Sequence, residues 1–101
     1  MYLLKFSKDS CNPCAILAMT MKRVSVPDVI ERVVEINVVA PSVHVPWRKY
    51  KHTMQSSLVD YSIRTVPTLV LVDSLGKEIA KHTGSATENE LKAWYSTFPA
   101  K

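Results

Sequence analysis

Two cysteines separated by two residues, Cys11 and Cys14, are the side chains of this chain best suited to chemistry. They follow an apolar run over 2–7 and stand at the start of a segment with helical character that begins near Pro13. Cysteines three apart at a helix start can form a disulfide, which needs Cα atoms roughly 4.4–6.8 Å apart. The spacing and the strand–turn–helix setting together indicate thiol–disulfide redox chemistry.

The two sulfurs are expected to have different parts in that chemistry. Cys11 lies just ahead of the helix, where free backbone N–H groups and the positive end of the helix dipole stabilise a thiolate. Cys14 lies one turn inside and is expected to be more buried. We therefore expect Cys11 to attack a substrate disulfide and Cys14 to resolve the mixed disulfide. Pro13 suits the first helical turn because its ring fixes φ and its missing N–H needs no partner there.

Three other interpretations of the cysteine pair stay open at this point. The pair could be half of a structural zinc site, for which His44, His52 and His82 are available, although none of them has a paired spacing. It could be a purely structural disulfide, although so small a loop adds little stability. It could also be two buried thiols with no chemical role.

Length and composition indicate a single domain over residues 1–101. The chain is 47% hydrophobic and 22% charged, and 101 residues suffice for one modest core. Because the CxxC pair supplies its only cysteines, the chain is not a disulfide scaffold, and a reducing cytoplasm is the simplest expected location. The apolar run at the N-terminus is short and interrupted by Lys5, so neither a signal peptide nor a membrane span is expected.

The net charge of the chain is +4, with one local basic cluster at Arg48, Lys49, Lys51 and His52. Such a cluster is typical of a solvent-facing helix, and it could also dock an acidic partner protein. A nucleic-acid partner is not expected, because no aromatic and basic module of a known kind accompanies the cluster.

The remaining pattern predicts the element order β-α-β-α-β-β-α. Strands are expected over 2–7, 33–39, 68–73 and 78–83, and helices over 13–23, over 47–61 and from 87 to near 98. Residues 28–32 are expected to form a last helical turn or a second short helix. Strands separated by helices are expected to pair in parallel, and the last two strands as an antiparallel hairpin. The pattern thus predicts an α/β fold with a four-stranded mixed sheet and helices on both faces.

A second motif, Thr65-Val66-Pro67-Thr68, stands directly before the predicted hairpin, and Gly76-Lys77 and Gly84 follow it. With the CxxC pair after the first strand, this arrangement resembles the thioredoxin family. The resemblance covers most of the chain and is weakest over 24–57.

The resemblance implies a cis peptide bond before Pro67, facing the cysteine pair; such a bond costs only about 0.5–1 kcal/mol over trans. It implies that the backbone of Val66 pairs with an extended substrate peptide as an added strand. Gly84 matches the glycine that lets this peptide approach, and Asn12 and Pro13 complete the expected substrate-binding residues. The activity implied is reduction of protein disulfides by dithiol–disulfide exchange, with no metal or organic cofactor.

The partners implied are disulfide-containing proteins, ribonucleotide reductase among them, and thioredoxin reductase or glutathione as electron donor. Lys8 and Arg64 are the candidates to bind the carboxylates of glutathione. A monomer with no nucleic-acid or membrane partner is expected. The alternative is a thioredoxin-fold binding module that docks on a larger protein through the basic cluster, with its thiols dispensable.

The chain departs from the family pattern at four points. It begins at the strand before CxxC, so the extra N-terminal strand and helix of thioredoxins are not expected, and the length is typical of glutaredoxins. Ser10 replaces a tryptophan before the first cysteine, which makes the substrate face less apolar. Asn12 replaces a glycine between the cysteines. Unusual residues there are common in small viral, bacterial and archaeal relatives, so a phage protein in a host cytoplasm is one interpretation.

Lys5 is the fourth departure, because thioredoxins carry there a buried aspartate that is thought to help deprotonate the resolving thiol. A Lys5 that points toward the sulfurs would favour the thiolate of Cys14 and make the protein more oxidising. A Lys5 that points to solvent would have no such effect. Both orientations are open on the sequence alone.

Overall fold

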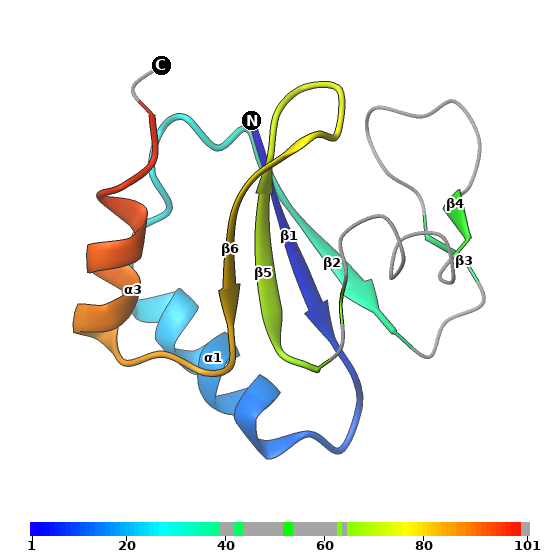
Figure 1. Ribbon diagram of the computed structural model, residues 1–101. Helices are drawn as coiled ribbons and strands as arrows, with labels where there is room; N and C mark the ends of the chain where they lie inside the picture. Colours follow the sequence, from blue (N-terminus) through cyan, green and yellow to red (C-terminus); the bar gives the residue numbers. More distant parts are fainter. Residues whose placement is uncertain (39–41, 44–51, 54–62, 64, 100–101) are drawn as a thin grey trace.

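The computed structural model describes residues 1–38, 42–43, 52–53, 63 and 65–99. Four strands in this part of the chain form one mixed sheet in the order β2-β1-β5-β6 (Figure 1). The elements of this sheet and the helices beside it are β1 (Tyr2–Ser7), α1 (Asn12–Arg23), β2 (Arg32–Asn37), β5 (Thr68–Val72), β6 (Glu78–Thr83) and α3 (Glu88–Tyr95). The predicted α/β fold with a four-stranded mixed sheet is confirmed.

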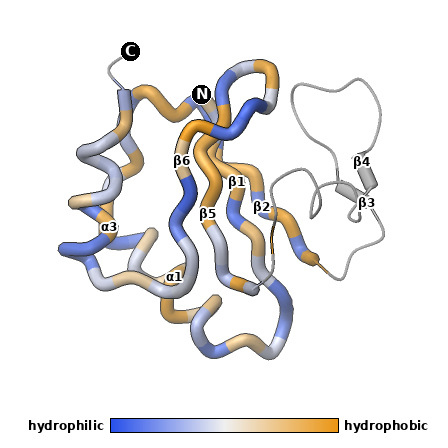
Figure 2. Tube along the Cα trace, in the orientation of Figure 1, coloured by the Kyte–Doolittle hydropathy of each residue, from blue (hydrophilic) through white to orange (hydrophobic). Residues whose placement is uncertain are grey.

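Strand β1 lies between β2 and β5, and the site is built at its carboxyl end. It pairs in parallel with β2 and antiparallel with β5. Successive side chains of a strand point to opposite faces, so Leu3 packs in one apolar cluster while Leu4 and Phe6 pack in another. Strand β5 is hydrophobic over most of its length and separates β1 from the more hydrophilic edge strand β6 (Figure 2).

The antiparallel pairing of β5 with β1 corrects the expectation that strands separated by helices pair in parallel. Phe6 lies opposite Ile36, near the end of β2, and also opposite Thr68, at the start of β5. The connection from β2 therefore re-enters the sheet at the end where it left. Since a parallel pairing needs a connection that crosses to the other end of the sheet, β5 runs back along β1.

Both described helices cover the same face of the sheet (Figure 1). The apolar cluster on this face consists of Leu3, Leu17, Val24, Leu69, Ala86, Leu91 and Tyr95. The cluster on the opposite face consists of Leu4, Phe6, Val34, Ile36, Val70 and Val72. The helix predicted over 47–61 is the element expected to cover that second face, and most of its residues lie outside the described ones.

Two residues within 47–61, His52 and Thr53, are described, and there the helix prediction is wrong. They form strand β4 (His52–Thr53), which pairs antiparallel with β3 (Ser42–Val43) in a separate two-stranded sheet. Val43 and Thr53 are both β-branched, and β-branched residues favour extended backbone over helix.

The sequence allowed a second short helix over residues 28–32, but the connection from α1 to β2 does not contain one. It forms a turn, closed by the N–H of Ile30 donating to the carbonyl of Pro27 at 2.9 Å. The N–H of Glu31 then donates to the carbonyl of Met1 at 2.8 Å. This bond already draws the chain beside β1, so β2 begins at once at Arg32.

The hairpin between β5 and β6 is confirmed, and a single carboxylate organises its turn. Asp73 accepts hydrogen bonds from the N–H groups of Leu75 and Lys77, each at 2.9 Å, and Gly76 supplies a φ of 88°. The hydrogen bond from Lys77 is the main cause that lowers the pKa of Asp73. The turn fixes β6 against β5.

Helix α3 begins at the capping box predicted from Thr87 and Glu90. The Glu90 N–H donates to Thr87 Oγ1 at 3.2 Å, and the Thr87 N–H donates to Glu90 Oε1 at 3.0 Å. The hydrogen bond from the Thr87 backbone is the main cause that lowers the pKa of Glu90. The helix ends at Tyr95, and a following turn brings Phe98 against Trp94 with ring centroids 4.7 Å apart.

Candidate active site

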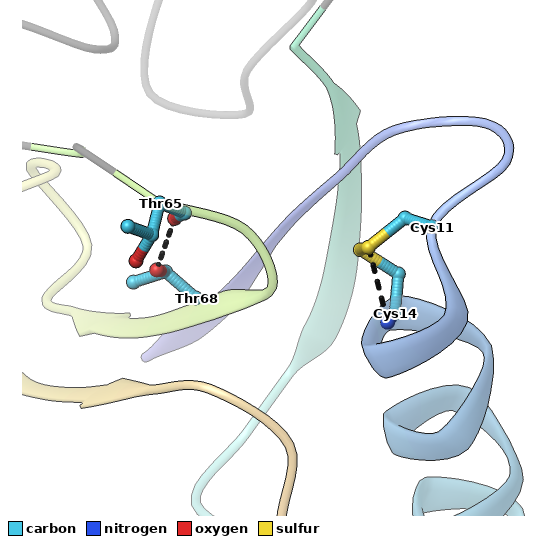
Figure 3. Close-up of a disulfide and its surroundings, with 4 residues drawn as sticks. All are labelled: Cys11, Cys14, Thr65 and Thr68. Carbon is cyan, nitrogen blue, oxygen red and sulfur yellow. Dashed lines mark hydrogen bonds between the residues drawn. A yellow bond between two sulfur atoms is a disulfide. The ribbon is translucent and has the colours of Figure 1, made fainter.

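The loop after β1 delivers Cys11 to the N-cap position of α1. Cys11 has extended backbone, and its Sγ accepts a hydrogen bond from the N–H of Cys14 at 3.2 Å. The two residues form a disulfide with Cα atoms 5.2 Å apart (Figure 3). This separation falls inside the range that an ordinary disulfide requires. Pro13 occupies the first helical turn, as predicted.

The two sulfurs differ in exposure in the expected direction. Cys14 is 5% exposed and lies on the inner side of α1, with Leu17 one turn later. Cys11 is only partly buried. An incoming sulfur can therefore reach Cys11 from solvent, whereas Cys14 is approached through Cys11.

A groove of about 700 Å³ opens beside Cys11. Its lining on the α1 side includes Cys11, Asn12 and Pro13, and its lining on the opposite side includes Thr65 and Val66. Figure 3 shows the loop with Thr65 and Thr68 across from the disulfide. Residues more than fifty positions apart in the sequence thus meet around one hollow.

The loop opposite the disulfide has the geometry that the resemblance implied. The Val66–Pro67 peptide bond is cis, as predicted. Thr68 Oγ1 donates to the carbonyl of Thr65 at 2.8 Å, and the N–H of Gly84 donates to the carbonyl of Pro67 at 2.8 Å. The loop is therefore tied both to itself and to the end of β6.

Gly84 has a φ of +91°, a conformation that residues with a side chain rarely adopt. Apart from Gly84 and its two chain neighbours, a Cβ added there would meet no atom of the described residues within 4 Å. Gly84 and Pro67 do not line the groove beside Cys11, whereas Asn12, Pro13 and Val66 do.

The thioredoxin-like domain family matches residues 2–99 of the sequence. The chain belongs to this family. The expected resemblance to thioredoxins is thereby confirmed. No curated protein matches the chain.

Solved structures with the same fold include thioredoxins and a thioredoxin-fold protein. A mutant thioredoxin from Halobacterium salinarum is 23% identical, with a TM-score of 0.67 over 99% of this chain and 75% of that one. The Fasciola hepatica thioredoxin is 20% identical, with a TM-score of 0.64 over 94% and 77%. A thioredoxin-fold protein from Helicobacter pylori is 20% identical, with a TM-score of 0.71 over 94% and 66%. These likenesses establish a shared fold.

Lys5 lies on the helix side of the sheet in this thioredoxin-like domain, the same face as Leu3. It is 8% exposed, and its Nζ lies 3.3 Å from Glu35 Oε1. It lines a second hollow, of about 340 Å³, together with Cys11 and Cys14. The Lys5 side chain is therefore buried and not directed into bulk solvent, and it borders the same hollow as the two sulfurs.

Several residues that line the groove were not predicted as site residues from the sequence. Val38 and Ile63 line the groove, as does Thr65, which belongs to the quoted Thr-Val-Pro-Thr motif. Glu35 was also missed, because its pairing with Lys5 depends on the register of β1 against β2. Apolar alternation identifies strands but does not determine which two residues lie opposite each other.

Some sequence predictions fall outside the described residues of the thioredoxin-like domain. The residues concerned are Arg64, His44 and the basic residues Arg48, Lys49 and Lys51. Of the two residues predicted to bind glutathione, Lys8 is described, and it lines the groove.

Within the described ranges, no three His, Cys, Asp or Glu residues are grouped so that they could hold a metal ion. No helix among those ranges is long and apolar enough to span a membrane.

Proposed function

We propose that this thioredoxin-like domain is a thiol–disulfide oxidoreductase that reduces protein disulfides. The observation that carries the proposal is the Cys11–Cys14 disulfide at the mouth of a groove whose other side is Val66, the residue before cis Pro67. One sulfur is accessible and the other is buried behind it. This asymmetry suits an exchange reaction that begins at one cysteine and ends at the other.

The first step belongs to Cys11 in the reduced protein. Its thiolate attacks one sulfur of a substrate disulfide, so a Cys11–substrate bond forms, the substrate S–S bond breaks, and the second substrate sulfur leaves as a thiolate that takes a proton from water. The N–H of Cys14, which donates to Cys11 Sγ at 3.2 Å in the disulfide, stabilises negative charge on this sulfur. The N-terminus of α1 is therefore the activating element.

The second step belongs to Cys14. Its thiolate attacks Cys11 Sγ, the Cys11–substrate bond breaks, and the intramolecular disulfide forms while the substrate leaves as a dithiol. Two electrons pass from the cysteine pair to the substrate in one cycle. A reductant then restores the dithiol, and thioredoxin reductase or glutathione is the proposed donor. No metal or organic cofactor enters these steps.

An extended segment of the substrate protein is proposed to bind in the groove. The backbone of Val66 pairs with this segment as an added strand, while Asn12 and Pro13 contact it beside the attacking sulfur. The open space at Gly84 lets the segment pass close to β6. We propose that the protein acts as a monomer and a single domain over 1–101. Ribonucleotide reductase is a candidate substrate by family resemblance.

Insulin reduction by dithiothreitol tests the proposed function. The wild-type protein is expected to accelerate precipitation of the insulin chains, and Cys11→Ser is expected to reduce the rate to that of dithiothreitol alone, because the remaining thiol of Cys14 is buried and cannot reach the substrate disulfide. Lys92→Ala, on the exposed side of α3, is the matched control and is expected to keep the wild-type rate. Wild-type turnover by Cys11→Ser would exclude the proposal.

A further inference from the structure

Lys5 is a charged residue in an otherwise buried stretch of β1. Its neighbours Leu4 and Phe6 are fully buried, and Lys5 itself is almost completely buried. Removing an ammonium group from water is costly unless nearby groups compensate its charge. The groups around Lys5 therefore indicate what this charge does.

Glu35 is the counter-charge that pairs with the Lys5 ammonium. Its Oε1 lies 3.3 Å from Lys5 Nζ, but the Glu35 side chain is 74% exposed. Water screens a carboxylate at such a position, so the pair is weakly coupled. Glu35 therefore compensates the charge of Lys5 only in part.

Lys5 also borders the hollow that the cysteine pair borders. Ser7, Lys8 and Ala18 also line this hollow, and no carboxylate does so among the described residues. From β5, the residue opposite Lys5 is the buried and uncharged Leu69. The charged groups that border the hollow are therefore two cations, of which Lys5 is buried and Lys8 is exposed.

We infer that the buried ammonium of Lys5 stabilises the thiolate of Cys14 in the reduced protein and so promotes the resolving step. This inference rests on the proposed function. Burial of a thiol disfavours its thiolate, whereas a cation within reach favours it. Lys5 thus offsets the burial of Cys14 without a general base.

The protons and electrons of the resolving step are all accounted for without a proton transfer to or from Lys5. Cys14 loses its proton to water in the hollow, and its thiolate attacks Cys11 Sγ. The new S–S bond expels the substrate sulfur as a thiolate, which takes a proton from water. The ammonium of Lys5 neither gives nor takes a proton and acts through its charge alone. A cation that stabilises the reduced form also makes the pair more oxidising.

Titration of Cys14 alone, in the Cys11→Ser background, tests the inference. The thiolate is followed by its ultraviolet absorbance as a function of pH. Adding Lys5→Met is expected to lower the acid dissociation constant of Cys14 about tenfold or more, as loss of a close opposite charge does. Adding Lys5→Arg is expected to restore most of it, because the charge returns.

Lys8→Met in the same background is the matched control. Lys8 borders the same hollow, but it is exposed, so water screens its charge and a much smaller change is expected. The inference is wrong if Lys5→Met leaves the titration of Cys14 unchanged, or shifts it no more than Lys8→Met does.

Lys5→Gln keeps the test decisive where Lys5→Met fails to fold. It keeps a polar side chain at this position and removes the charge, so the acid dissociation constant of Cys14 is expected to fall as with Lys5→Met; no change or a rise counts against the inference. The titration requires no turnover, so the two proposals fail separately. An unresponsive Cys14 in a protein that still reduces insulin rejects only the role of Lys5, whereas turnover by Cys11→Ser rejects the oxidoreductase itself.

Discussion

Cys14→Ser is expected to accumulate as a covalent complex with a disulfide-bearing protein, joined through Cys11. Cys11 still lies at the start of α1 beside the groove, so the first exchange proceeds. The serine cannot attack the mixed disulfide, so the substrate stays attached. The complex is measured on a non-reducing gel with reduced Cys14→Ser and an oxidised protein substrate, and dithiothreitol should dissolve it.

Two proteins serve as controls for the trapping experiment. Cys11→Ser keeps the buried sulfur and loses the more accessible one, so it is expected to trap nothing. The wild type is expected to release its substrate and leave no lasting complex. Equal trapping by the two single-cysteine variants would mean that the order of attack is not set by the exposure of the sulfurs.

Leu17→Ala is expected to lower the free energy of unfolding by about 2–5 kcal/mol, the usual cost of truncating a buried leucine. Leu17 is 0% exposed and packs with Leu3 and Leu69, so it holds α1 against the sheet one turn after Cys14. A loss of this size is a large part of the roughly 5–15 kcal/mol that stabilises a typical domain. Urea denaturation of the oxidised protein measures it.

Ile16→Ala is the control for Leu17→Ala on the same helix. Ile16 is 53% exposed, so its truncation leaves no cavity, and the free energy of unfolding is expected to change by only about 0.5 kcal/mol. Similar losses for the two variants would contradict the assignment of Leu17 to the buried face of α1.

The sequence predicted best where a local motif determines geometry. The CxxC spacing predicted the disulfide and its place at a helix start, and Thr87 with Glu90 predicted the start of α3. The cis bond before Pro67 followed only from resemblance to a family, because a proline in sequence does not reveal the isomer of its peptide bond.

The sequence predicted less well where geometry depends on residues far apart. The direction of β5 depends on where the chain re-enters the sheet, and the intervening residues carry no local signal of it. The position of Lys5 beside the cysteine pair is another feature that depends on residues far apart in the sequence. Its alternation with Leu4 and Phe6 places it on the face opposite theirs, but only the packing of α1 shows that this face holds the cysteines.

The reactivity of the two thiols toward iodoacetamide in the reduced wild-type protein tests the central claim most directly. The rate of alkylation at each cysteine is followed by mass spectrometry as a function of pH. We expect Cys11 to react first, with a titration midpoint below the value of about 8.5 for an ordinary cysteine. Reaction at Cys14 first, or at both sulfurs equally with ordinary midpoints, would contradict an accessible and acidic Cys11 at the start of α1.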